Sequence, residues 1–385
     1  MILIDYKRIK DLQSKQKEIL LFASKIDERR ISTKIDPQLS PISWHLIHCT
    51  YIEVLWLRSI YLHDNYYKDK LEKIADSSLV PENKRGKNLP KLEELLLFAK
   101  KIFSENIRII KETACSKKKE GQLKLSYLLD FLNQHHAQHI ETMKVIKNML
   151  NIKFSKSFHK NAFEITPKDY KFSGEEVKEG KYLIGAGKKE FSYDNEKPRN
   201  IIYLKDFLIS KKIITVAEWF TFILDNGYKR KELWSSKGWN WKTKNRIAHP
   251  ISWKFSNKKK FAISTPEGYI KPDSKMPVTN ISKHELEAFA KCNKLRLPHE
   301  YEWEVAAKKI SDKFKVWEWA ENKFFGYKGF KAFPYKEYSY PWFDKDYYTL
   351  KGSSLYTLKE IRRYSFRNFY KPDTQYIFSG GRLCL

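Results

Sequence analysis

The sequence predicts an α+β protein, in which a bundle of helices is followed by a mixed domain rich in loops. From Met1 to Leu150, apolar residues recur at helical spacing in four separate segments. After Leu150 the pattern changes to short β-type runs separated by turn residues. At 385 residues, the chain is long enough for two domains, each with its own core. We expect a helical bundle over residues 1–152, a polar linker over 153–180 and a mixed domain over 181–385.

The four segments of the bundle are expected to be helices. Ser40-Pro41 is a typical helix start and opens the helix expected over residues 41–61. Pro90 opens a further helix. The remaining two helices are predicted at the N-terminus and around residues 123–150, and the polar stretch 64–89 is expected to connect two of them. In the second domain we expect strands at 181–185 and 200–204 and helices at 215–224 and 283–292.

Composition narrows the class of protein. Hydrophobic residues make up 42% and aromatic residues 15% of the chain, which is typical of a globular protein. No apolar run is long enough for a membrane span, and no secretory signal is recognisable at the N-terminus. The four cysteines are scattered and form no Cys-x-x-Cys pair, as expected for reduced thiols. These features predict a cytoplasmic protein with no membrane partner.

The net charge of +28 suggests a nucleic-acid partner at first sight. The lysines are spread along the whole chain, however, and no arginine-rich arm or long basic block stands out. We therefore expect no specific nucleic-acid partner. A nucleic-acid-associated protein remains an alternative, and it predicts binding that weakens steeply as salt rises.

Histidines mark a candidate metal site in the bundle. His135 and His139 are four residues apart in a predicted helix, so their side chains share one face. His45 and His48 lie in the helix predicted at 41–61, and one of them would supply a third imidazole. Three protein ligands with open positions are typical of non-haem iron sites, and zinc is the competing metal. Two polar residues on a solvated face are the plain alternative for such a pair.

Motifs along the chain resemble a known pair of fused domains. The stretches 185–199, 226–239, 277–307, 316–319, 350–354 and 365–368 are similar to the formylglycine-generating-enzyme (sulfatase-modifying factor) fold, which is C-type-lectin-like. Trp44-His45-Leu46-x-His48 together with His135-x-x-x-His139 resembles a DinB-like helical bundle. The two are fused in the iron-dependent sulfoxide synthases of ergothioneine and ovothiol biosynthesis, and the elements around 193–196 and 226–234 resemble the ergothioneine branch more closely.

The resemblance implies an enzyme that uses iron(II), Fe(2+), and O2 to join a thiol sulfur to the imidazole of a trimethylated histidine. Its partners would be these small molecules, with the iron where the two domains meet. His45 and His136 correspond to no family ligand, and we expect packing or solvent contact for both. A tyrosine donates a proton in the family. The corresponding site residues are metal ligands His48, His135 and His139; catalytic Tyr335, with Tyr327 in reserve; and substrate-binding Gln138, Tyr338, Asn368, Phe369 and Arg85.

Some positions depart from the family pattern and leave alternatives open. Tyr370 and Thr374 stand where ergothioneine enzymes hold γ-glutamylcysteine with an acidic residue and an arginine. The sulfur donor is therefore undetermined, and an ovothiol- or selenoneine-type synthase is an alternative. Zinc-dependent hydrolysis or thiol transfer is another. A third is a lectin-like binding protein with vestigial histidines, which predicts no tight metal and no oxygen consumption.

Overall fold

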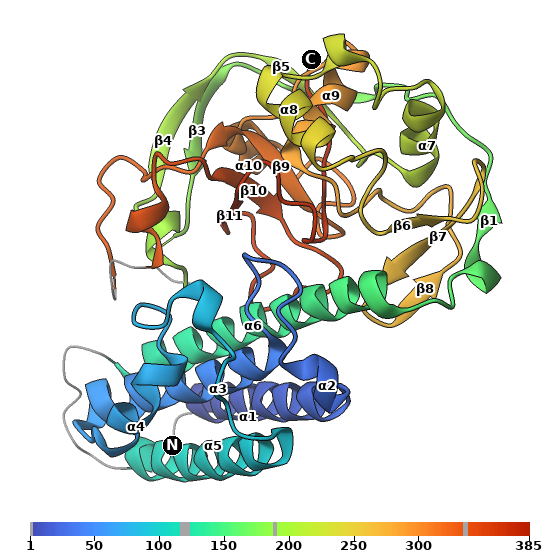
Figure 1. Cartoon of the computed structure of the whole chain (residues 1–385). Coiled ribbons are helices and arrows are strands. Elements are labelled where there is room, and N and C mark those ends of the chain that lie inside the picture. Colours follow the sequence, from blue (N-terminus) through green and yellow to red (C-terminus); the bar gives the residue numbers. More distant parts are fainter. Residues whose placement is uncertain (1–2, 116–123, 188–190, 334–337) are drawn as a thin grey trace. The chain divides into compact units, whose positions relative to one another are not determined.

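The computed structural model describes residues 3–115, 124–187, 191–333 and 338–385. The chain divides into two compact units. The first comprises residues 1–150 and 358–361, and the second comprises 151–357 and 362–385. The two units are drawn in Figure 1.

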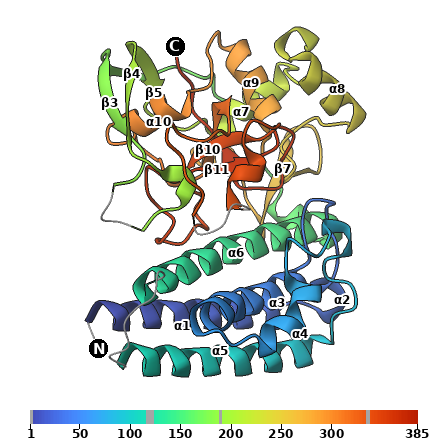
Figure 2. The ribbon, with the colours of Figure 1, turned by 90° about the vertical axis from the view of Figure 1, so that its left-hand side faces the viewer.

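The first unit is helical. Figure 2 shows its long helices lying alongside one another. Its elements are α1 (Leu3–Ser24), α2 (Glu28–Ile31), α3 (Ile42–Glu53), the π-helix η1 (Val54–Tyr61), α4 (Tyr66–Ala75), the 3₁₀ turn η2 (Glu82–Lys84), α5 (Leu92–Cys115) and α6 (Leu125–Phe154). The predicted bundle is confirmed, and the helix expected over 41–61 is present as α3 continuing into η1.

Apolar stripes hold this bundle together. Ile9, Leu12 and Ile19 of α1 recur at helical spacing and are each almost completely buried. In α3 every residue is buried, so this helix lies in the interior and has no solvated face. Pro41 caps the start of α3 in extended backbone, which fits its fixed φ and its missing N–H group.

One element of the first unit was missed by the sequence prediction. The stretch 64–89, expected as a polar connection, contains α4. Only Leu71 and Ala75 of α4 are buried, so its apolar pattern is short. Asp64 helps to start it, because its carboxylate accepts a hydrogen bond from the backbone N–H of Tyr66 at 3.1 Å.

The second unit combines small sheets with short helices. Its strands are β1 (Phe163–Glu164), β2 (Gly174–Val177), β3 (Gly180–Ile184), β4 (Asn200–Leu204), β5 (Phe207–Ser210), β6 (Trp253–Phe255), β7 (Lys260–Thr265), β8 (Gly268–Ile270), β9 (Trp317–Lys323), β10 (Tyr348–Gly352), β11 (Asn368–Tyr370) and β12 (Ser379–Gly380). Its helices and turns are η3 (His159–Asn161), η4 (Asp194–Glu196), α7 (Val216–Leu224), η5 (Lys231–Leu233), α8 (Ser236–Lys244), α9 (Lys283–Cys292), α10 (Glu300–Ala306) and η7 (Tyr340–Trp342).

The strands form two four-stranded sheets and two two-stranded sheets. One sheet has the order β1-β7-β6 with β8 also paired to β7, and the other has the order β11-β10-β9-β12. β2 pairs with β5, and β3 pairs with β4. All pairings are antiparallel except β9 with β12. The segment 153–180, expected to be a linker, therefore contributes two strands to the second unit, because β1 pairs with β7 and β2 with β5.

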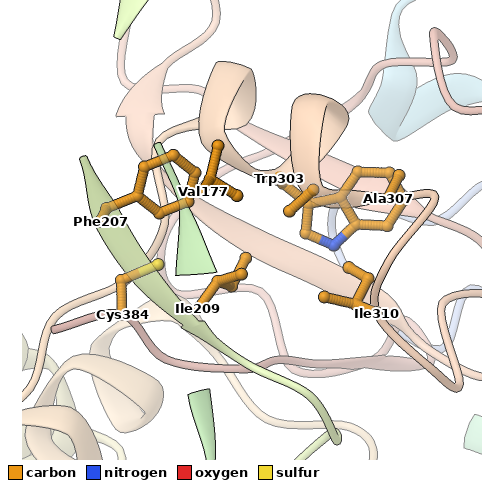
Figure 3. Packing of buried hydrophobic residues seen from close by; sticks show 8 residues of the cluster. Val177, Phe207, Ile209, Trp303, Ala307, Ile310 and Cys384 are labelled. Carbon is orange, nitrogen blue, oxygen red and sulfur yellow. The ribbon is translucent and has the colours of Figure 1, made fainter. Parts of the chain in front are cut away.

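A compact apolar cluster joins β2, β5 and α10. Its buried members come from four separate parts of the chain, and most are labelled in Figure 3: Val177, Phe207, Ile209, Trp303, Ala306, Ala307, Ile310 and Cys384. The helices expected at 215–224 and 283–292 are confirmed as α7 and α9. Thr215 and Ser282 cap them, each accepting a hydrogen bond from the backbone N–H three residues further on.

Candidate metal centre

Two helices of the first unit carry the histidines. α3 presents His45 and His48, and α6 presents His135, His136 and His139. α6 is a long helix without proline or glycine, which keeps the i, i+4 relation between His135 and His139 regular.

The structure brings His48, His135 and His139 together. One ring nitrogen from each lies within 4.8 Å of the others. The ring centroids of His135 and His139 are 4.3 Å apart. The centroid of the His48 ring lies 5.3 Å from that of His135 and 4.9 Å from that of His139. His48 and His135 are buried and His139 is half-buried. This spacing suits three imidazoles that converge on one metal ion.

The Nδ1 atom of each of these three histidines already has a partner. His48 donates its Nδ1–H to the backbone oxygen of Ala75 at 2.7 Å. Nδ1 of His139 lies 2.8 Å from Nδ1 of His45, and Nδ1 of His135 lies 3.5 Å from Nδ1 of His136. A partner on one ring nitrogen fixes the tautomer and leaves the other nitrogen for a metal. For His48 the carbonyl partner fixes the proton on Nδ1, which leaves Nε2 to offer to a metal ion.

Burial keeps these imidazoles in the form that binds metal. Desolvation lowers the pKa of His48 to about 4, and it lowers the pKa values of His135 and His139 well below the usual value. Each histidine also feels its neighbours, because a positive charge on one disfavours a second. The site is therefore neutral at pH 7, so that binding a metal ion would displace few protons.

An aromatic stack positions His48 further. The Trp44 ring lies parallel to the His48 ring with centroids 4.4 Å apart. The guanidinium of Arg85 lies 4.7 Å from the centre of the Trp44 ring. Arg85 is itself held by hydrogen bonds to the backbone oxygens of Val80 and Ser77. The indole thus lies between a cation and a candidate ligand, which limits rotation of the His48 ring.

Cys49 is close to this group but is a poorer ligand. Its sulfur, together with nitrogens of His135 and His136, forms a second group of three possible ligand atoms within 4.8 Å. Burial raises the pKa of the Cys49 thiol well above its ordinary value, and the carboxylate of Glu53 raises it further. Because metals bind the thiolate, the three-histidine group fits a metal ion better.

Comparisons with known proteins show what the chain resembles. Residues 166–315 match the sulfatase-modifying factor enzyme 1-like domain. The hercynine oxygenase of Mycolicibacterium thermoresistibile is 25% identical, over 93% of this chain and 90% of its own length. The chain is thus similar to a hercynine oxygenase over nearly its whole length. The resemblance that its motifs predicted is thereby confirmed.

Two further hercynine oxygenases align over a shorter stretch. Those of Mycobacterium tuberculosis and Mycolicibacterium smegmatis are each 28% identical, over 52% and 53% of this chain. These alignments span 57% and 59% of the two enzymes. The structure of PvdO from Pseudomonas aeruginosa is similar over 58% of this chain, with 14% identity and a TM-score of 0.38. Among the described residues, no helix is long and apolar enough to cross a membrane.

The substrate-binding residues predicted by likeness to the hercynine oxygenases lie in both units. Gln138 is half-buried on α6, directly before His139. Phe369 on β11 stacks on Phe324, with ring centroids 4.2 Å apart, and Asn368 accepts a hydrogen bond from the Phe369 N–H through its own side-chain oxygen. Tyr338 stacks on Tyr193 at 4.3 Å.

Of the two candidate proton donors, only Tyr327 lies among the described residues. Tyr335, the predicted donor, lies outside the described residues. Tyr327, the reserve candidate, is 2% exposed, and the guanidinium of Arg367 lies 4.2 Å from its ring centre. Burial raises the pKa of Tyr327 well above its ordinary value. Tyr327 is therefore part of the core of the second unit.

Of the two roles expected for His45 and His136, packing or solvent contact, their burial supports packing. His45 is 5% exposed and His136 is completely buried. His45 pairs with His139 as described, and Nε2 of His136 lies 2.8 Å from a carboxylate oxygen of Glu53. Sequence reasoning also missed Glu53 itself. The signal was available, because a lone carboxylate within the apolar run of the second helix needs a buried partner.

Proposed function

We propose that this protein is an O2-dependent sulfoxide synthase that joins a thiol sulfur to the imidazole of a trimethylated histidine, with iron(II) held by His48, His135 and His139. One observation carries the proposal: three imidazoles converge, two of them buried and that of His139 half-buried, each with Nδ1 already paired. They do so in a chain that aligns over 93% of its length with a hercynine oxygenase. Hercynine is the betaine of histidine, which gives the substrate class.

The overall reaction balances without an outside reductant. The imidazole C–H bond and the thiol S–H bond are broken, and a C–S bond and an S–O bond are formed. The four electrons released reduce O2, so that one oxygen atom enters the sulfoxide and the other leaves as water. Bound iron(II) would supply the redox chemistry that lets O2 oxidise a thiol sulfur.

The chain supplies binding, orientation and protons around that site. Three protein ligands leave coordination positions open for small molecules. Gln138 follows His135 by three residues and directly precedes His139, so it occupies the same turn of α6 as the ligands. We assign to it a hydrogen bond to the imidazole of the substrate. Tyr335 is assigned the proton transfer to reduced oxygen.

Residues of β11 are assigned to the other end of the histidine substrate. The Asn368 side-chain oxygen is used by a backbone N–H, which leaves its amide N–H groups to donate to a carboxylate. Phe369 offers an aromatic face to a trimethylammonium group, a cation–π contact. Tyr338 is assigned to the wall of the same pocket.

The thiol donor is the open part of the proposal. Tyr370 and Thr374 replace the residues that hold γ-glutamylcysteine in the resembling enzymes. We assign to Arg85 the binding of a carboxylate of the donor. Iron(II) and a free thiol both require a reducing compartment, which favours the cytoplasm.

Anaerobic reconstitution with Fe(II) tests the proposal. Oxygen uptake is then followed with trimethylhistidine plus either cysteine or γ-glutamylcysteine, and the product is identified by mass spectrometry. We expect a product with the joined masses of both substrates, less two hydrogens, plus one oxygen, and no product from His135→Ala. Bound iron without coupling of either thiol would refute the substrate assignment, and the absence of any bound metal would refute the site.

A further inference from the structure

Glu53 is a buried carboxylate that accepts hydrogen bonds from three side chains of the helical unit, those of Gln16, Asn106 and His136. Its side chain is completely buried at the end of α3. One oxygen accepts hydrogen bonds from Gln16 and from Nε2 of His136, both at 2.8 Å. The other accepts from Asn106 at 2.9 Å and from Gln16 at 3.0 Å. Burying a carboxylate is costly unless it is hydrogen-bonded, so these contacts hold Glu53 in one orientation against His136.

His136 connects this carboxylate to the metal site. The carboxylate can only accept, so Nε2 of His136 carries the proton of that hydrogen bond. On its other side, Nδ1 of His136 lies 3.5 Å from Nδ1 of His135, the outer limit of a hydrogen bond. The two ring nitrogens of His136 thus connect the Glu53 carboxylate to a candidate ligand.

We propose that Glu53 and His136 form a positioning dyad that fixes the orientation of the His135 ring for metal binding. This inference rests on the proposed function, because it assumes that His135 is a ligand. Neither residue touches the metal or the substrate. Carboxylate–histidine–metal chains are a general device for strengthening a ligand, and here a second imidazole lies between the carboxylate and the ligand.

The surroundings of the dyad hold it rigidly. Asn106 donates to Glu53 and accepts from Nε of Arg58 at 2.7 Å, so its amide cannot rotate freely. Arg58 also pairs with Glu105 at 2.8 Å. The network draws on α1, α3, η1, α5 and α6, which are all parts of one unit. A ligand held through such a network has little freedom to turn away from the metal.

Three variants separate a positioning role from a packing role. His136→Phe fills the same space next to Phe103, whose ring centroid lies 6.0 Å away, but removes both hydrogen bonds. His136→Gln keeps an N–H for Glu53 and an oxygen for His135. Glu53→Gln removes the charge and, because its amide N–H groups face other donors, disturbs the network.

The probe is Co(II) alone, added anaerobically to the full chain and followed by its visible ligand-field absorption. We expect His136→Phe and Glu53→Gln to raise the Kd for Co(II) by about 10–100-fold, as loss of such partners does elsewhere. The absorption bands should shift as well. His136→Gln should restore a Kd close to that of the wild type.

Thr50→Val is the matched control. Thr50 lies on the same helix as Glu53, is fully buried, and donates only to the backbone oxygen of Leu46 among the described contacts. Its loss should lower stability without changing the Kd or the absorption bands.

The possible failures are distinguishable. Wild-type protein that binds no Co(II) would overturn the metal site and the dyad together. Wild-type protein that binds Co(II), with Glu53→Gln and His136→Phe binding equally well, would overturn the dyad alone. If His136→Phe does not fold, the Kd values of Glu53→Gln and His136→Gln for Co(II) are compared instead. Equal values would overturn the dyad, and weaker binding by Glu53→Gln would support it.

Discussion

Replacing Arg367 with alanine should destabilise the second unit strongly. Arg367 and Glu300 are both completely buried, and they form a two-pronged ion pair with N–O distances of 2.6 and 2.8 Å. The guanidinium also donates to the backbone oxygens of Asn195 and Phe325. Arg367, directly before β11, therefore ties this part of the chain to α10, to η4 and to the segment after β9. The alanine variant would leave the Glu300 carboxylate buried and uncompensated.

The expected loss is about 3–5 kcal/mol of unfolding free energy, the usual cost of breaking a buried ion pair. For a domain of this size, each kcal/mol lowers Tm by about 2–4 °C, so Tm should fall by about 6–20 °C. Thermal unfolding monitored by near-ultraviolet circular dichroism measures this shift. Arg230, in an exposed pair with Glu232, is the control, and Arg230→Ala should leave Tm unchanged.

A double variant separates the pair from the space it fills. Replacing Arg367 by methionine and Glu300 by leucine together removes both charges, so the double variant should be more stable than Arg367→Met alone. An Arg367→Ala protein that unfolds at the wild-type temperature would refute this reasoning.

Three further outcomes are expected. In the unfolded chain a histidine binds a proton below about pH 6.5, whereas burial lowers the pKa of folded His48 to about 4 and of His45 to about 3. Metal-free protein should therefore lose stability as the pH falls from 6.5 towards 4, by up to about 1.4 kcal/mol per pH unit for each such histidine, and Tm measured between pH 7.5 and 5 checks this. Burial raises the pKa of Glu285 to about 7, so this residue destabilises the fold as the pH rises from 4.5 to 7 and offsets the effect of one histidine. A Tm that does not change with pH would contradict the burial of neutral His45 and His48. Gln138→Ala should raise KM for the histidine substrate while leaving the Kd for Co(II) unchanged, and an unchanged KM would exclude Gln138 from the substrate pocket. Fe(II) at about 1,000 times its Kd should stabilise the protein by about 4 kcal/mol, seen as a higher Tm that a chelator reverses, and no shift would mean no binding to the folded state.

Helical periodicity and residue spacing indicated most of the histidines that the candidate metal centre brings together. The i, i+4 relation places His135 and His139 on one face of any regular helix, so it holds before the fold is known. The apolar residues around His45 and His48 indicated an interior helix. That His48, rather than His45, joins the pair came from the resemblance to a known family, since two histidines three apart on a buried helix are equivalent in sequence.

The elements that were missed depend on contacts between distant residues. The pairing of Phe163 with Phe261 defines β1, and no local signal marks a strand this short. The π-helix after Glu53 carries the same apolar pattern as an α-helix, so periodicity could not distinguish the two. The hydrogen bond between His136 and Glu53 joins residues 83 positions apart, and only the packing of α3 against α6 reveals it.

Iron stoichiometry tests the central claim most directly. Protein loaded anaerobically with Fe(II) and freed of excess metal by gel filtration should contain about one iron per chain, as a single three-histidine site requires. His48→Ala, His135→Ala and His139→Ala should each lose it. His63→Asn, which changes an exposed histidine of the same unit and suits its positive φ of 62°, should keep it. Retention of a full equivalent of iron by all three alanine variants would contradict the account.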